Sequence, residues 1–432
     1  MQWREKYKDK IVGSAKEAVS VVKSGDIVTF QQVHGETKEF LQAIVDRAEE
    51  LKDVKIVGNL HWGPADYAKP EYKESFRGIS NFIGPNTRPY CSAGQMDFLP
   101  LFYYQLEEVY TTSLAPDVFL LMLTPPDEQG RCSFGLNADF SVACAASAKK
   151  VVVQINPSMP YTHGSYFSLE DATCIYEKDE PIHEVFMAQV GDLELQMGKY
   201  IAPLIPDGAT LQLGIGGVPD AVLSCLTDKK DLGIHSELFS DGVVDLYEAG
   251  VITNQKKTLY PGKFIANFLI GSKKLFDFVD KNEDVLILPV HITNHPQIIA
   301  QNENMISINS CLQVDLYGQI AADTLGGKQF SGVGGQVDFV RGAQMSKGGK
   351  SIITVRSTAL KETVSNIVLH LPQGTPVTTS RFDVQYVCSE YGIVNLRGLT
   401  VSDRAKALIR IAHPKFRDEL EKQAREAKMI TD

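Results

Sequence analysis

The sequence predicts an α/β protein made of two similar domains, each built around a largely parallel sheet. Short apolar runs of strand length alternate with amphipathic stretches along the chain. The runs are continuously apolar rather than alternating with polar residues, which is typical of strands that are covered on both faces of a parallel sheet. At 432 residues the chain is also too long for one ordinary core, so more than one domain is expected.

The individual elements follow from these patterns. Amphipathic stretches at residues 37–52 and 193–205 predict helices, because their apolar positions recur at helical spacing. The runs that predict strands are 26–30, 54–60, 118–124, 150–156, 209–215, 284–290 and 350–355.

Two segments of the chain share one plan. Residues 16–30 and 198–217 each contain an amphipathic helix, a tight turn with Gly and Asp, and a strand that runs into a polar or glycine-rich loop. This echo predicts an N-terminal domain at 1–185 and a C-terminal domain at 186–432, joined by a charged, Pro-containing connection at about 177–187. We expect the active site at the domain interface, because ligands usually bind in clefts between domains.

Composition excludes several classes of protein. The net charge is −10 and no block of Lys or Arg is present, so nucleic-acid binding through a basic face is not expected. No apolar run reaches the roughly 18 residues that a membrane span needs. The charged N-terminus and the scattered seven cysteines predict a cytoplasmic protein without a disulfide framework or a metal site.

A lone carboxylate stands out in the stretch GIHSELFSDGVVDLYEAGVIT, residues 233–253. Glu237 follows a short apolar run, where a strand ends and a helix begins. Asp241 is predicted to cap that helix and Gly250 to end it. Glu237 is either a solvated turn residue or part of a reaction centre, and its surroundings alone leave both interpretations open.

Two glycine clusters are candidates for ligand contacts. Gly214, Gly216 and Gly217 follow a strand, but Pro219 stands where a dinucleotide fingerprint needs glycine, so a simple tight turn is the alternative. The cluster with Gly332, Gly334 and Gly335 does not lead into an obvious helix. It is equally compatible with a surface turn or with a nest of amides for an anion or an oxyanion.

The sequence argues against a metal site and against a serine-hydrolase site. His291 and His295 are four residues apart, but Pro296 and the preceding strand predict a loop without a third metal ligand, in which Asn294 is a hydrogen-bonding residue. No G-x-S-x-G elbow is present. A carboxylate beside glycine loops remains, and a carboxylate nucleophile is useful only against an activated acyl donor such as a thioester.

The chain resembles the acetyl-CoA hydrolase/transferase family of CoA-transferases. The resemblance runs nearly from end to end. It is carried by the Glu237 segment and by GPNTR, PPDEQGRCSFG, LQLGIGGVPDAV, ITNHP, DLYGQI, GVGGQVDF and the stretch from Cys388 to Leu420. It implies a CoA-transferase-like fold, with coenzyme A or acyl-CoA as substrate and no tightly bound cofactor. A homodimer or higher homo-oligomer is also implied.

The resemblance also implies roles for individual residues. Glu237 would be the nucleophile that forms a glutamyl-CoA thioester in a ping-pong exchange. The other catalytic positions implied are Gly334, Gly335, Glu390 and Asn294, and the CoA-contacting positions are Gly214, Gly216, Gly217, Gln212 and Gly332.

The implied activity is transfer of CoA between acetyl-CoA and a small carboxylate, 4-hydroxybutyrate or butyrate. Acyl-CoA hydrolysis and succinyl- or propionyl-CoA:acetate transfer are the alternatives. The segment FQQVHGET is polar at Gln31, Gln32 and His34, where a small apolar segment is expected for the family.

Overall fold

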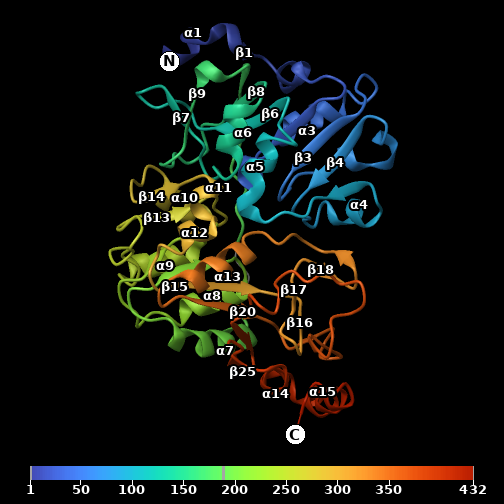
Figure 1. The fold of residues 1–432 in the computed structure, drawn as a ribbon. Helices are drawn as coiled ribbons and strands as arrows, with labels where there is room; N and C mark the ends of the chain where they lie inside the picture. Colours follow the sequence, from blue (N-terminus) through green and yellow to red (C-terminus); the bar gives the residue numbers. More distant parts are fainter. Residues whose placement is uncertain (1, 187–189, 432) are drawn as a thin grey trace. The chain divides into compact units, whose positions relative to one another are not determined.

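The computed structural model describes residues 2–186 and 190–431, and these form two compact units (Figure 1). Unit 1 contains the described residues up to Val185 together with Ile265–Thr293, and unit 2 contains those of Phe186–Phe264 and Asn294–Asp432. Residues 265–293, which the predicted boundary gives to the C-terminal domain, therefore pack with unit 1. Residue 187, the end of the predicted connection, lies outside the described residues.

Unit 1 is built on a sheet of eight described strands, every neighbouring pair of which is parallel (Figure 1). The strands follow apolar runs, and the residues of β6 (Val118–Leu123) are all buried. In spatial order they are β1 (Ile11–Val12), β10 (Cys174–Glu177), β8 (Lys150–Ile155), β6, β2 (Ile27–Phe30), β3 (Val54–Gly58), β4 (Phe76–Ser80) and β5 (Met96–Phe98).

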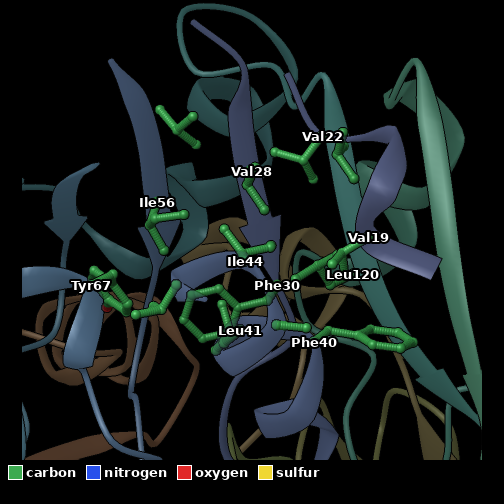
Figure 2. Packing of buried hydrophobic residues seen from close by; sticks show 14 of the residues in the cluster. Val19, Val22, Val28, Phe30, Phe40, Leu41, Ile44, Ile56, Tyr67 and Leu120 are labelled. Atoms are coloured by element: carbon green, nitrogen blue, oxygen red, sulfur yellow. The ribbon is translucent and has the colours of Figure 1, made fainter. Parts of the chain in front are cut away.

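Helix α3 (Lys38–Val45) covers one face of this sheet. Its buried Phe40, Leu41 and Ile44 belong to one apolar cluster with Phe30 and Ile56 of the neighbouring strands (Figure 2). Full burial of such a side chain stabilises the fold by roughly 1.5–3 kcal/mol. The helix is shorter than predicted from residues 37–52, because the N–H groups of residues 47 and 48 donate to carbonyls three residues back and tighten the chain into turns.

Unit 2 contains a second sheet, which is parallel except for its last pair. In spatial order its strands are β12 (Gly233–Ile234), β11 (Thr210–Leu213), β15 (Met305–Ser310), β20 (Lys350–Thr354), β24 (Tyr386–Ser389) and β25 (Gly392–Asn395). Val340 of α13 (Gln336–Met345) and Leu408 of α14 (Val401–Ile411) are buried in a core cluster with Ile353 and Val387 of the sheet.

The predicted fold class is confirmed. Six of the seven predicted strands are β2, β3, β6, β8, β11 and β20 in the large sheets. The seventh, predicted at 284–290, is only β14 (Val285–Ile287) and lies outside both large sheets. The chain turns into helix α11 (Val290–Thr293) directly after Pro289, because proline cannot donate to a strand ladder.

The shared plan of the two segments is also present in the structure. In unit 1, α2 (Ala15–Ala18) continues as a 3-10 turn and reaches β2 through Gly25, at φ 82°. In unit 2, α7 (Asp192–Ile201) continues in the same way and reaches β11 through Gly208, at φ 73°. Both turns require a left-handed residue, which glycine adopts without steric cost. Within 2–186 and 190–431, no helix is long and apolar enough to cross a membrane.

Candidate active site

Glu237 lies in the segment between β12 and helix α9 (Asp241–Glu248) of unit 2. His235 and Ser236 on its N-terminal side are buried, whereas Glu237 itself is only partly buried. The Ser236 hydroxyl donates to the carbonyl of Leu213 at 3.2 Å and ties this segment to the end of β11. The carboxylate is therefore carried by a firmly packed backbone while its own side chain retains access.

The predicted cap of α9 is wrong by one residue. Ser240, with extended backbone angles, is the N-cap, and Asp241 is the first helical residue. An acidic side chain in the first turn is still favourable, because the helix N-terminus carries a partial positive charge. The predicted end is confirmed, since Gly250 follows the helix at φ 76°.

Asn294 is the first neighbour of the Glu237 carboxylate. It is fully buried, and its Nδ2 donates to Glu237 Oε2 at 3.0 Å. The same Nδ2 lies 3.4 Å from Asp338 Oδ2. Asn294 lies in a turn, as predicted, but this turn joins the short helices α11 and α12 (Pro296–Ile299), which were not predicted. Pro296 opens α12, a position where the missing N–H of proline costs nothing.

Gly335 is the second neighbour. A Cβ atom at this position would lie 2.0 Å from Glu237 Oε2 and 2.4 Å from Asn294 Nδ2. Gly335 is the N-cap of α13, and Gly334 before it is left-handed at φ 52°. The expectation that this cluster leads into no helix is therefore wrong. Gly332 lies three residues earlier, in the irregular segment before the turn that enters α13.

This arrangement places a carboxylate at a helix N-terminus. The first amides of a helix have no intrahelical acceptor, and with the helix dipole they favour negative charge. Asp338 lies inside the motif GVGGQVDF, but no role was predicted for it. It is buried in the first turn of α13 and shares Asn294 with Glu237. Its position three residues after Gly335 would have indicated it only if the helix had been foreseen.

The other glycine loop borders a cleft of unit 2. Gly216, at φ 115°, is the N-cap of α8 (Gly217–Ser224). The cleft measures about 610 Å³, which is within the range of small-molecule sites. Its walls include Gly216, Gly217, Ser310, Cys311, Thr354 and Arg356. Gly214 immediately precedes this loop.

The wall of this cleft also carries a cation, Arg356, which is not among the predicted site residues. Arg356 follows β20, its side chain is 61% exposed, and it forms an ion pair with the buried Glu194. Cys311 also lines the cleft, and burial raises the pKa of its thiol. A protonated thiol is a poor nucleophile, so Cys311 does not compete with a carboxylate for that role.

The cleft and the Glu237 carboxylate are connected through α13. Gln336, the residue after Gly335, donates from Nε2 to the carbonyl of Ser310 at 2.8 Å. Ser310 lines the cleft. The start of α13 therefore lies against the carboxylate at Gly335 and binds the cleft wall through Gln336.

Two predicted site residues, Glu390 and Gln212, hydrogen-bond to neighbouring segments of unit 2. Glu390, in the turn between β24 and β25, accepts hydrogen bonds from the backbone N–H (3.0 Å) and the hydroxyl of Ser357. It thereby holds the segment that carries Arg356. Gln212 of β11 accepts from Ser307 Oγ at 2.7 Å and from Asn309 Nδ2 at 3.0 Å, so its amide joins two neighbouring strands.

Comparison with known proteins gives the family. Residues 1–185 match the acetyl-CoA hydrolase/transferase N-terminal domain, and residues 271–424 match the corresponding C-terminal domain. The chain is 46% identical to 4-hydroxybutyrate coenzyme A transferase of Clostridium kluyveri, over 97% of this chain and 98% of that protein. It is 36% identical to butyryl-CoA:acetate CoA-transferase of Anaerostipes caccae, over 99% of both.

A solved structure supports the same relationship. The chain is 39% identical to 4-hydroxybutyrate CoA-transferase of Porphyromonas gingivalis, with a TM-score of 0.84 over 99% of this chain and all of that one. Both family models and these end-to-end relatives lead to one conclusion: the chain belongs to the acetyl-CoA hydrolase/transferase family.

Proposed function

We propose that this protein, an enzyme of the CoA-transferase type, moves CoA between an acyl-CoA and a free carboxylate with Glu237 as its nucleophile. One observation carries the proposal. The Glu237 carboxylate lies against the Cα of Gly335 at the start of α13 and accepts a hydrogen bond from Asn294. A carboxylate held among hydrogen-bond donors is ready to attack an activated acyl carbon.

The first step forms an anhydride. A Glu237 oxygen attacks the thioester carbonyl, the carbonyl electrons move onto its oxygen, and the C–S bond then breaks to release CoA thiolate. The backbone amides at Gly334 and Gly335 are the proposed donors to the transient oxyanion. Losing one such donor typically costs about 10²–10³ in rate.

The second step makes the covalent enzyme intermediate. The thiolate attacks the Glu237 carboxyl carbon and expels the first carboxylic acid as its anion, which leaves a glutamyl-CoA thioester. A second carboxylate attacks that thioester, and the two steps then run in reverse to give the new acyl-CoA and free Glu237. One thioester replaces another, so the cycle needs no ATP.

The cleft beside the glycine loop is the proposed site for the rest of CoA. Gly214, Gly216, Gly217, Gln212 and Gly332 remain the proposed border of the pantetheine arm. The exposed Arg356 guanidinium in the cleft wall is suited to a phosphate, because arginine donates in a fixed fork. Contacts so far from the sulfur can offset the cost of the reactive anhydride. Glu390 serves this site through Ser357.

The proposed substrates are acetyl-CoA with 4-hydroxybutyrate or butyrate. The names of the relatives in Clostridium kluyveri and Anaerostipes caccae support this choice. Hydrolysis is the second candidate, because the matched family models include acetyl-CoA hydrolases. In hydrolysis, water in place of a carboxylate would attack the glutamyl thioester. A cytoplasmic homodimer is proposed on the family resemblance.

Glu237→Gln tests the mechanism directly. The amide keeps the shape of the side chain but is not a nucleophile, so transfer should fall by at least about 10³-fold while CoA binding persists. The matched control is Glu248→Gln on the exposed side of α9, which should keep full activity.

A trapping experiment tests the covalent intermediate. Wild-type enzyme incubated with acyl-CoA alone and then with borohydride should lose activity, because the glutamyl thioester is reduced to an alcohol. Mass spectrometry should locate the change at Glu237. Substantial transfer by the Gln variant, or activity that survives borohydride, would rule out this mechanism.

A further inference from the structure

The strand that leads to Glu237 is the outermost strand of its sheet. Within the described part of unit 2, β12 pairs in the sheet only with β11, through Gly233 and Ile234. The N–H groups of Gly233 and His235 donate inward, to the carbonyls of Ala209 and Leu211. The N–H and C=O of Ile234 therefore face away from β11, and an edge of this kind needs other partners when it is buried.

Two side chains bind the outward backbone groups of Ile234, as a further strand would. Asn254 Oδ1 accepts from the Ile234 N–H at 2.8 Å, and Lys257 Nζ donates to the Ile234 carbonyl at 2.7 Å. Asn254 holds its side chain there with a left-handed backbone, at φ 59°. Both residues are buried, so both outward groups of Ile234 are satisfied by side chains.

Lys257 is an unusual choice for such a position. Its side chain is 4% exposed, and its Nζ donates to a second carbonyl, that of Lys263, at 2.6 Å. Its stem lies over Gly233, where a Cβ atom would approach Lys257 Cγ to 2.4 Å. Burial lowers the pKa of Lys257 to about 7. A neutral amine has two protons to donate, which is the number that the two carbonyls require.

We propose that Lys257 is a positioning residue for Glu237: by holding the Ile234 carbonyl it fixes the outer edge of β12, three residues before the nucleophile. The inference rests on the proposed role of Glu237. Backbone bonds hold the inner edge of β12 to β11, and a bridge joins Leu232 to Ile252 just before the strand. The side-chain bonds of Asn254 and Lys257 fix the outward groups of Ile234, the strand residue nearest to Glu237. Displacement of a reacting group by about 1 Å can cost on the order of 100-fold in rate.

Lys257→Met is the test. Methionine keeps an apolar stem of similar length but cannot donate, so β12 should lose its anchor while Gly233 keeps its packing. We expect kcat to fall about 10- to 100-fold, with KM for acyl-CoA within threefold of wild type. Borohydride trapping after acyl-CoA should slow in parallel. The control is Lys256→Met on the exposed neighbouring residue, which should leave kcat unchanged.

Asn254→Gly gives an independent test if the methionine variant does not fold. Glycine keeps the left-handed backbone but removes the acceptor from the Ile234 N–H, so kcat should fall with KM again little changed. A folded Lys257→Met enzyme with kcat within twofold of wild type overturns the proposal. If that variant does not fold, a normal kcat for Asn254→Gly overturns it. Full activity of Glu237→Gln would instead remove the proposed function itself.

Discussion

At the scale of single residues, the position of the Glu237 carboxylate depends on the absence of a side chain at Gly335. Gly335 has an ordinary backbone angle, φ −86°, so its backbone does not require glycine. The requirement comes from space, because any Cβ atom there would overlap Glu237 Oε2 and Asn294 Nδ2. The glycine therefore allows two polar side chains, Glu237 and Asn294, to converge at the start of α13.

Gly335→Ala should separate these groups. Because the helix backbone is packed, we expect the Glu237 side chain and Asn294 to move rather than α13, with kcat lower by about 100-fold or more. Alanine tolerates this backbone angle, so any fall in the thermal midpoint should come from displacing the buried Asn294. Gly13→Ala is the control, because the nearest atom to its Cβ is 3.8 Å away. An alanine variant with wild-type kcat would show that the close approach is dispensable.

Some residues of the candidate site could be predicted from the sequence and others could not. Glu237, Gly335 and Asn294 are adjacent in the structure, and all three were selected from the family motifs. Asp338 lies in one of these motifs but was given no role, and Lys257 was not selected, because the roles of both depend on contacts between segments far apart in the chain. Asp338 meets Asn294 from 44 residues away and Lys257 meets Ile234 from 23. No local pattern records such a contact.

At the scale of elements, strands were predicted well and helix starts less well. Strands such as β6 and β8 are apolar throughout because both faces are covered, and that leaves a clear signal in the sequence. Helix α13 begins at Gln336, and its N-cap is Gly335, which offers no side-chain cap. No Ser, Thr, Asp or Asn stands at the N-cap to mark the start of a helix, so the glycine that makes room for Glu237 also hides the helix.

In unit 1, the polar segment after β2 is used to join elements. Gln31 donates to the carbonyl of Asn137 and accepts from the N–H of Met122. Gln32 donates to Asp139 Oδ2 at 2.7 Å. The side-chain amides of Gln31 and Gln32 thus hydrogen-bond to other segments of unit 1, which explains why polar residues follow an apolar strand there. Asp139 is fully buried, and burial raises the pKa of its carboxyl to about 7.

That carboxyl predicts a pH-dependent stability. An unfolded Asp has a pKa near 3.9, so between about pH 4 and 7 the folded state keeps a proton that the unfolded state has lost. Stability contributed by this group is therefore present below pH 4 and is lost as the pH rises through 7. Thermal midpoints should fall between pH 5 and 8 in wild type and less so in Asp139→Asn. Parallel pH profiles for the two proteins would contradict the assignment.

At the scale of the whole molecule, the relatives match this chain from end to end. Coverage of 97% or more extends to proteins named for 4-hydroxybutyrate and for butyryl-CoA:acetate transfer. We expect the proposed chemistry at Glu237 to be common to them, while the carboxylate substrates differ, as their names indicate. The motifs therefore predict the reaction type more readily than the substrate. Every acceptor has a carboxylate group, but the acceptors differ in the rest of the molecule.

A screen of carboxylate acceptors therefore tests the proposed substrates and the balance between transfer and hydrolysis. With acetyl-CoA as donor, 4-hydroxybutyrate and butyrate should give new acyl-CoA faster than propionate or succinate, as followed by chromatography. Free CoA released without any added carboxylate should be much slower than transfer, because water must be excluded for the glutamyl thioester to wait for its second acid. If CoA release is equally fast with and without a carboxylate, the protein is a hydrolase. If succinate is the best acceptor, the proposed acid is wrong while the glutamyl mechanism stands.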